Sequence, residues 1–552
     1  METVRLYLEG RPVTLDSRET VETALLKTGI THDGQITVAQ MGNRLIRLDT
    51  KAYRLADKGL TLLDLNHSDG VRVYVRTLCF VMAMACARLY PQAILQIAHS
   101  VSKGLYCELT GGPALTTETV GRIRREMRSL IEGDLRIERR EMTKEELIRY
   151  SERHGLSDRA RLLHYRPEDT VHPYVCGDYI DYYYGYLTPR TSYVGLFDLI
   201  AHEPGMILRY PRKEYAKTLP PYLDSPKHFD IFAESERLGA LSGVLCIADV
   251  NDRILSGQGP DMVRICEALH EKKIAAISDR IAERMGDVKL VLVAGPSSSG
   301  KTTFVQRLRV QLMTHGIRCL TISLDNYYRE RSEAPLGPDG LPDLECLEAL
   351  DTDLFNAQMQ ALAAGDTVRL PVFNFTIGKR EPGAEVCLAP DQVLLVEGIH
   401  GLNERLSASI PQAQKYKIYI SALTQLNMDE HNRIPTTDTR LIRRLVRDAR
   451  TRGSSVQETL AMWPSVRVGE KRYIFPHQEQ ADIMFNSAMP YELAALKEPA
   501  LAIMSGITEE DPSFIEVHRL RKFLKYFTAL PHDSISENSI LREFIGGSCF
   551  EV

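Results

Sequence analysis

The chain has 552 residues, of which 44% are hydrophobic, 26% charged and 7% aromatic, which is an ordinary composition for a soluble globular protein. The length exceeds what one hydrophobic core supports and predicts about three or four domains. The formal net charge of −5 argues against a surface built for bulk nucleic-acid binding, although it leaves room for a local basic face.

Ten cysteines are scattered along the chain, and none of them forms a C-x-x-C pair. This pattern predicts free thiols in a reducing compartment rather than a zinc or redox site. Residues 1–5 lead into a polar alternating strand instead of an apolar signal core, and the longest apolar run, residues 78–87, is too short to span a bilayer. We therefore expect a cytoplasmic protein with no membrane partner.

Residues 1–64 have the pattern of a small α+β unit. Short alternating segments predict strands, and a helical spacing that stops at Gly29 predicts one helix. The predicted elements are strands at 4–8 and 12–15 joined by a turn at Gly10 and Arg11, a helix at 19–27, and strands at 36–41 and 45–48.

Residues 65–225 are predicted to form a second α+β region, in which apolar spacing and N-terminal capping residues mark the helices. The predicted elements are an apolar helix at 75–89, a charged amphipathic helix at 117–132 capped by Thr116 or Thr117, a helix opened by the capping box of Thr143 and Glu146, and strands in the tyrosine-rich stretch 179–193. The proline-rich segment 213–226 indicates the end of this region.

A helical connector is expected over 226–286, and residues 287–490 follow with the pattern of an α/β domain. Nearly continuous apolar strands alternate with helices there, as is typical of a parallel, doubly wound sheet whose two faces are buried. The strands are predicted at 288–294, 319–324 and 393–396.

The segment G-P-S-S-S-G-K-T at 295–302 fits the phosphate-binding pattern G-x-x-x-x-G-K-[ST] and lies between an apolar strand and a predicted helix at 303–314. Glycines let backbone N–H groups curl around phosphate oxygens, and the helix N-terminus adds partial positive charge. We expect Lys301 to neutralise the β- and γ-phosphates and Thr302 to ligate Mg²⁺. A plain turn would leave both residues without a role. The residues predicted to hold the nucleotide, Mg·ATP, are Gly295, Ser297, Ser298, Ser299, Gly300, Lys301, Thr302 and Thr303.

Two further strands of this domain end in acidic residues, Asp325 and Glu397. The carboxyl ends of parallel strands face the ligand crevice. We therefore expect Asp325 to act as the general base that accepts a proton from an attacking hydroxyl, and Glu397 to lie near Mg²⁺, directly or through water. The alternative for each is an ordinary loop acid.

The segment D-T-R-L-I-R-R-L-V-R-D-A-R-T-R at 438–452 has helical spacing that places its arginines at 440, 443, 444 and 447 on one face. Acids are scarce within the segment, so the helix is expected to stay positively charged. It is predicted to close as a lid over the phosphates, with Arg443 and Arg447 stabilising the transferred group. A solvated, charge-rich helix is the alternative.

These segments, in this order, resemble the uridine kinase and phosphoribulokinase branch of the P-loop kinases. The resemblance rests on the phosphate loop together with S-L-D-N-Y-Y at 323–328, P-V-F-N-F at 371–375, V-E-G-I at 396–399 and the arginine segment. It implies ATP-dependent phosphorylation of the 5′-hydroxyl of a uridine- or cytidine-like nucleoside, with Mg²⁺ as cofactor. The resemblance places the acceptor beside Tyr327, Glu348, Phe373, Phe375 and Arg440.

Three positions depart from that family's acceptor pocket. Phe373 replaces a tyrosine, Gly378 stands where a histidine is expected, and Glu348 takes the place of a ribose-binding aspartate. A pocket that loses polar contacts to the base loses the hydrogen bonds that enforce discrimination. A second hypothesis is therefore a sugar or small-alcohol kinase of the phosphoribulokinase type.

The front half resembles different proteins. Residues 1–64 resemble a TGS domain, the ubiquitin-like module of threonyl-tRNA synthetases and some regulatory GTPases, and residues 65–210 resemble the second additional, or editing, domain of that synthetase. The landmarks are R-L-Y-P at 88–91, K-G-L-Y at 103–106 and G-D-Y-I-D at 177–181. Counting from them, the metal ligands of that domain fall at Arg76, Phe80, Tyr183 and Leu187, so no metal is expected there.

The predicted fold is an α/β P-loop kinase domain preceded by a small α+β TGS-like domain, an editing-domain-like region and the connector, and followed by a helical docking tail at 491–552. A third functional hypothesis is an RNA- or ribosome-associated regulatory NTPase whose front half binds RNA. The chain has no N-K-x-D motif, which favours ATP over GTP. The resemblance to uridine kinases also leaves room for a homo-oligomer.

Overall fold

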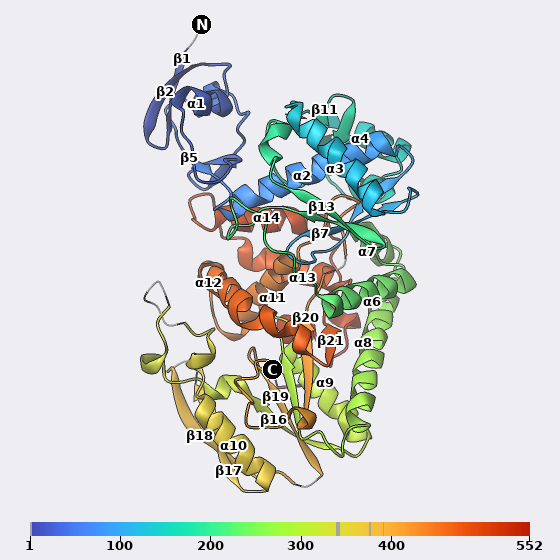
Figure 1. Cartoon of the computed structure of the whole chain (residues 1–552), viewed down its shortest axis with the longest axis vertical. Coiled ribbons are helices and arrows are strands. Elements are labelled where there is room, and N and C mark those ends of the chain that lie inside the picture. The colour runs from blue at the N-terminus through green and yellow to red at the C-terminus, as the bar shows by residue number, and fades with distance from the viewer. Residues whose placement is uncertain are drawn as a thin grey trace.

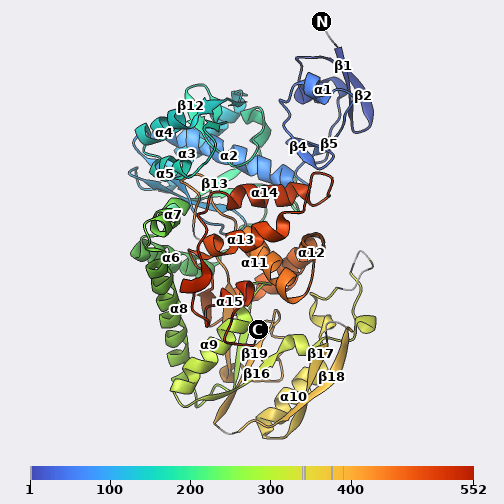
Figure 2. The same ribbon diagram turned by 180° about the vertical axis from the view of Figure 1, so that it is seen from behind.

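The computed structural model describes residues 3–551 apart from 338–339, 341–342, 375–376, 390 and 425. Figure 1 shows an elongated molecule, with the N-terminal unit at one end and the hairpin of β17 (Val368–Asn374) and β18 (Lys379–Val386) at the other. Helices α11 (Thr436–Thr451), α13 (Glu492–Met504) and α14 (Phe514–Leu524) lie between these ends, so C-terminal segments join the two halves (Figures 1 and 2).

A five-stranded sheet organises the C-terminal half in the order β16-β19-β15-β20-β21, and every neighbouring pair is parallel. The strands are β15 (Leu290–Ala294), β16 (Arg318–Ser323), β19 (Gln392–Glu397), β20 (Lys415–Ser421) and β21 (Ile483–Asn486). The two valines of β15 pack with α9 (Lys301–Thr314) on one face, and its two leucines pack with α10 (Thr352–Ala364) on the other. The predicted parallel sheet with two buried faces is confirmed.

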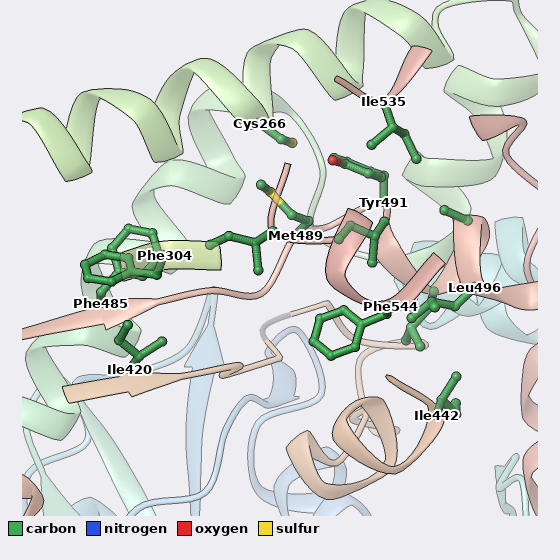
Figure 3. Packing of buried hydrophobic residues seen from close by; sticks show 14 of the residues in the cluster. Cys266, Phe304, Ile420, Ile442, Phe485, Met489, Tyr491, Leu496, Ile535 and Phe544 are labelled. Carbon is green, nitrogen blue, oxygen red and sulfur yellow. The ribbon is translucent and has the colours of Figure 1, made fainter. Parts of the chain in front are cut away.

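The remaining helices of this half are α6 (Pro226–Ser242), α7 (Ile247–Leu255), α8 (Gly259–Ala282), α12 (Val456–Gly469) and α15 (Arg542–Ile545). The C-terminal tail is part of the hydrophobic core of the C-terminal half. Figure 3 shows Phe544 of α15 in the same buried cluster as Phe304, Phe485 and Tyr491. Ile540 is also fully buried, so the tail covers the loop end of the sheet rather than hanging free.

The N-terminal unit is a mixed five-stranded sheet in the order β2-β1-β5-β3-β4 with one helix. Its elements are β1 (Thr3–Leu8), β2 (Arg11–Asp16), α1 (Val21–Thr28), β3 (Val38–Met41), β4 (Arg44–Ile46) and β5 (Gly59–Leu63). Helix α1 is capped by Thr20 and stops at Gly29 in the left-handed conformation, as predicted. Strand β5 was not predicted, because its pairing partners lie far away along the chain and no local turn marks it.

A second unit surrounds α2 (Ser68–Leu89). By length and composition α2 could cross a membrane, but 72% of its most apolar window is buried inside the fold, as in the core helix of a globular domain. A sheet in the order β13-β14-β7-β6 packs with it. The other elements are β6 (Ile94–Ile97), β7 (Leu105–Thr110), α3 (Thr117–Glu132), β8 (Glu138–Arg139), β9 (Met142–Thr143), α4 (Lys144–Arg153), α5 (Ser157–His164), β10 (Thr170–Val171), β11 (Tyr174–Cys176), β12 (Tyr179–Asp181), β13 (Asp198–His202) and β14 (Gly205–Arg209). The predicted N-cap of α3 and capping box of α4 are both present.

The tyrosine-rich stretch is not the predicted run of strands. Within residues 179–193, all of which are described, strand β12 ends at Asp181 and the chain is irregular beyond it up to a 3-10 turn at Thr191–Val194. Tyr183 packs into the second unit beside Phe80, whereas the ring of Tyr184 meets that of Tyr526 with centroids 4.8 Å apart. The alternation reflects side chains that face two different neighbours, and not a pleated strand.

Candidate active site

The predicted phosphate-binding loop follows β15 and leads directly into α9, as the motif requires. A Cβ at Gly295 would collide with the backbone carbonyl oxygen of Ile420, and Gly300 has a φ of +81° at the N-cap of α9. The loop can adopt this path only with glycine at both positions.

The loop carries polar side chains that could contact a bound phosphate. Lys301 and Thr302 are partly exposed. The hydroxyls of Ser298 and Ser299 are buried and have no hydrogen-bond partner within the described part of the chain. Buried polar atoms normally find a partner, so a bound phosphate suits this loop.

Asp325 and Glu397 lie at the carboxyl ends of two neighbouring strands. Ser323, at the end of β16, pairs in register with Glu397 at the end of β19, and its hydroxyl donates a 3.0 Å hydrogen bond to the Glu397 carboxylate. Asp325 follows in the 3-10 turn Leu324–Tyr327. The fold thus brings together two acids that were predicted from separate motifs.

Burial raises the pKa of Asp325 and raises that of Glu397 to about 7, because both carboxylates lose hydration. The positive charge of Lys301 opposes both shifts, and the charge of Asp325 raises the pKa of Glu397 further. Lys301 therefore lies close enough to act on both acids.

This donor set fits a magnesium ion. Mg²⁺ usually takes only one or two protein carboxylates and completes its shell with substrate phosphates and water. Among the described residues there is no group of three or more histidine, cysteine or acidic side chains that could hold a metal alone. The Glu397 carboxylate and the Thr302 hydroxyl fit the sparser set. When bound with ATP, the ion would supply positive charge to the phosphates.

Helix α11 does not form an exposed lid. Arg440 and Arg443 are 1% and 0% exposed. Their guanidinium groups donate to the backbone carbonyls of Ser297 at 2.8 Å and Ser298 at 3.3 Å. In this structure the two arginines hold the phosphate loop in shape, although they were predicted at the acceptor and at the transferred group.

The prediction that α11 keeps an unbalanced positive charge is wrong. Glu470 and Glu492 lie outside the helix in sequence and form ion pairs with Arg440 and Arg443. Asp448 pairs with further arginines of α11. Counting charges within the segment could not reveal the first two carboxylates, because tertiary folding brings them to the helix.

The charge of Arg447 acts on Asp325, the predicted general base. This positive charge, together with that of Arg452, opposes the raised pKa of Asp325. Arg447 is also 2.9 Å from Asp448. Arg452, the C-cap of α11, was missed because it falls off the helical spacing that defined the arginine face.

Two residues predicted at the acceptor point elsewhere. Tyr327 is fully buried, and its hydroxyl donates to the side-chain oxygen of Gln358 at 2.8 Å. Glu348 is at the surface, where it pairs with Arg405 at 2.8 Å. In this fold the two side chains therefore have protein partners of their own, Gln358 for Tyr327 and Arg405 for Glu348.

Tyr328, next to Tyr327, and Glu345, three residues before Glu348, lie near Asp325 instead. After burial, the charges of Asp325 and Glu345 raise the pKa of Tyr328. Burial likewise raises the pKa of Glu345 to about 7, and Asp325 adds to that shift. Phe373 is 8% exposed, and its ring lies 5.7 Å from that of Tyr328. Phe375 lies outside the described residues. Tyr328 therefore lies beside Phe373 and near the two acids Asp325 and Glu345.

The front half is joined to this domain by buried charges. Arg159 of the front half lies 3.8 Å from Asp429, and the Nδ1 atom of His431 lies 2.9 Å from the carboxylate of Asp181. Tyr184 donates to Asp429 at 3.1 Å. His431 and Asp429 precede α11, so the front half contacts the chain just before the helix that holds the phosphate loop.

Three features of this site define a P-loop kinase. They are a parallel sheet with a phosphate-binding loop after its central strand, a lysine in the first turn of the next helix, and acids that end two neighbouring strands.

Residues 290–494 match the Phosphoribulokinase / Uridine kinase family. A uridine kinase from Chloroflexus aurantiacus is 30% identical over 197 residues, which are 36% of this chain and 85% of the relative. One from Brevibacillus brevis is 28% identical over 201 residues, again 36% and 85%. A structure described as a possible uridine kinase from Bacillus stearothermophilus aligns with 38% of this chain and 97% of its own, at 16% identity and a TM-score of 0.26. The chain belongs to the phosphoribulokinase and uridine kinase family, through its residues 290–494.

Proposed function

We propose that the chain transfers the γ-phosphoryl group of Mg·ATP to the 5′-hydroxyl of a uridine- or cytidine-like nucleoside. The observation that carries the proposal is the placement of Asp325 and Glu397 at adjacent strand ends, where the charge of Lys301 acts on both. The uridine kinase activity named for the relatives supports a nucleoside as the acceptor.

Each residue has a role that follows from its position. Asp325 accepts the proton of the acceptor hydroxyl as that oxygen forms a bond to the γ-phosphorus and the bond to the ADP oxygen breaks. Lys301 and the N-terminus of α9 balance the negative charge of the phosphates. Arg447 and Arg452 add further positive charge near Asp325. Phe373 and Tyr328 provide an aromatic wall for the acceptor.

A sugar or small-alcohol kinase is the second candidate, and Phe373 supports it. The apolar ring of Phe373 offers no hydrogen bond to a nucleobase. The aromatic wall of Phe373 and Tyr328 therefore selects an acceptor by its shape more than by its polar groups. The two candidates differ in one measurable respect, which is whether the acceptor carries a nucleobase.

Phosphate transfer from radiolabelled ATP tests both candidates on one panel of ribonucleosides, sugars and sugar phosphates. We expect transfer to uridine or cytidine, and loss of about a hundredfold or more in kcat for Asp325→Asn with ATP binding retained. Asp366→Asn, an exposed aspartate remote from the loop, is the matched control. Transfer to sugars alone would select the second candidate. A folded enzyme that transfers to no alcohol, or an Asp325→Asn variant with full activity, would refute the proposal.

For the front half we propose a TGS-like unit at residues 1–64 and an editing-domain-like unit at residues 65–225. The sequence landmarks support both assignments. The mixed sheet with its single helix supports the first, and the position of α2 against residues 183–187 supports the second.

A further inference from the structure

A cavity of about 420 Å³ lies away from the phosphate loop, where the front half meets the C-terminal half. Its walls are α2, the tyrosine-rich segment, the residues leading into α11, and α14. The volume falls within the usual range for small-molecule sites, which often form between domains.

The cavity is strongly basic. Nine arginines and lysines line it, against two acids, Glu168 and Asp438, among the described residues of its wall. Asp438 is already paired with Arg519, and Glu168 lies 3.3 Å from Arg166. Six of the nine cations have no carboxylate within ion-pair distance in the described part of the chain: Arg76, Arg139, Arg212, Arg433, Lys522 and Lys525.

These cations converge from separate segments. Arg76 comes from α2, Arg433 precedes α11, and Lys522 lies in α14, of which Lys525 is the C-cap. The Nε atom of Arg433 is buried and has no hydrogen-bond partner within the described chain. Burial lowers the pKa of Arg76 to about 10, with the charges of Arg72 and Arg519 adding to the shift. Because the positive charges of these side chains repel one another, a bound anion would stabilise the cluster.

The same cavity is lined with aromatic rings. Tyr182, Tyr184 and Tyr526 lie together, with the Tyr182 and Tyr526 hydroxyls 3.4 Å apart. The guanidinium group of Arg212 stacks over Tyr210 at 4.5 Å. The hydroxyl of Tyr183 is buried without a hydrogen-bond partner in the described chain. A ligand that fits this wall has a flat ring and polar edges as well as negative charge.

We propose that this cavity binds a free nucleoside phosphate, with its phosphate on Arg76, Arg433 and Lys522 and its base against the tyrosines. Inorganic phosphate would satisfy the cations but leave the aromatic wall unused. A bare nucleoside would leave the cations unpaired. The site is separate from the phosphate loop, so its ligand need not be a substrate of the kinase.

Arg76 and Tyr183 also occupy two of the positions at which the resemblance places metal ligands of an editing domain. Arginine and a neutral tyrosine do not ligate a metal, but they bind phosphate and a base edge. The replacement therefore favours anion binding over metal-dependent hydrolysis at this place in the fold.

Isothermal titration of the full chain with AMP, GMP, CMP and UMP tests the proposal, with inorganic phosphate and a short single-stranded RNA as comparison ligands. The background is Lys301→Ala, which weakens binding at the phosphate loop. We expect at least one nucleotide to bind, more tightly than inorganic phosphate, and to bind about tenfold more weakly in Lys522→Gln and in Arg433→Gln. Lys522 is exposed, so its variant is expected to fold even if Arg433→Gln does not.

The matched control is Arg125→Gln, an exposed arginine of α3 that is not part of the cavity wall. It should leave nucleotide binding unchanged. Binding that Lys301→Ala abolishes but Lys522→Gln does not affect would overturn the proposal. Cavity-dependent binding of the RNA without any binding of free nucleotides would overturn it in favour of an RNA end.

Discussion

The carboxylate of Glu543, in the C-terminal tail, accepts hydrogen bonds from both the backbone N–H of Thr303 at 3.3 Å and the Thr303 hydroxyl at 3.0 Å. Thr303 lies in the first turn of α9, where free N–H groups and the helix dipole attract phosphate. Arg450 holds the tail in place by donating to the backbone carbonyls of Glu543 and Phe544. The tail therefore places a negative charge on one of the residues predicted to hold the nucleotide.

Replacing Glu543 by glutamine is expected to lower the KM for ATP about three- to tenfold, because a like charge leaves the phosphate-binding turn while the side chain keeps its size. Steady-state kinetics at varied ATP would measure this. Glu537→Gln, an exposed glutamate of the same tail, is the control. An unchanged or raised KM would show that Glu543 only caps the helix.

Glu397 is expected to make stability depend on pH in the absence of Mg²⁺ and nucleotide. Its pKa is about 7 in the folded chain against an ordinary 4.5, so its favourable contribution is fully present below pH 4.5 and is lost as the pH rises through 7. The difference corresponds to about 3 kcal/mol.

Chemical denaturation of the wild type and of Glu397→Gln across this pH range would measure the effect. We expect the free energy of unfolding of the variant to fall less between pH 4.5 and pH 8, because glutamine does not titrate. Parallel curves for the two proteins would mean that the carboxyl of Glu397 titrates normally.

Replacing Arg440 is expected to lower mainly the stability of the protein, and replacing Arg447 is expected to lower mainly its kcat, although both residues lie on α11. Arg440→Ala removes a buried guanidinium that donates to the Ser297 carbonyl and leaves the buried Glu470 with Arg467 as its one remaining arginine partner among the described residues, so it should lower the free energy of unfolding by about 3 kcal/mol. Arg447→Ala should cost about 1 kcal/mol, because Asp448 keeps Arg444 and Arg452 as ion-pair partners. Its main effect should be a lower kcat. Urea denaturation and initial rates on the same samples test both, and equal stability losses would contradict the assignment.

Glu345 and Glu348 are three residues apart and provide a matched pair for the acceptor side. Glu345→Gln should raise the KM for the acceptor about tenfold and leave the KM for ATP unchanged, because the side chain lies near Asp325. Glu348→Gln should change neither constant, since Glu348 pairs with Arg405 at the surface. The opposite result would restore Glu348 to the acceptor pocket, as the sequence motif suggests.

Local sequence determined the parts of this protein that depend on short-range physics. The phosphate loop was predictable because its glycines, lysine and threonine act within one strand–turn–helix unit, and Asp325 and Glu397 were predictable because parallel strands end at a common edge. Caps such as Thr116 and the Thr143–Glu146 box were predictable for the same reason.

Only the tertiary structure decided which charges are neutralised and which side chains face the site. Glu470 and Glu492 pair with the arginines of α11 from distant positions in the chain. Tyr328 and Glu345 lie near Asp325 in place of the predicted Tyr327 and Glu348, whose side chains bind Gln358 and Arg405. The basic cavity and the contact of Glu543 with the phosphate loop each join segments hundreds of residues apart, and no local pattern encodes which distant surfaces will meet.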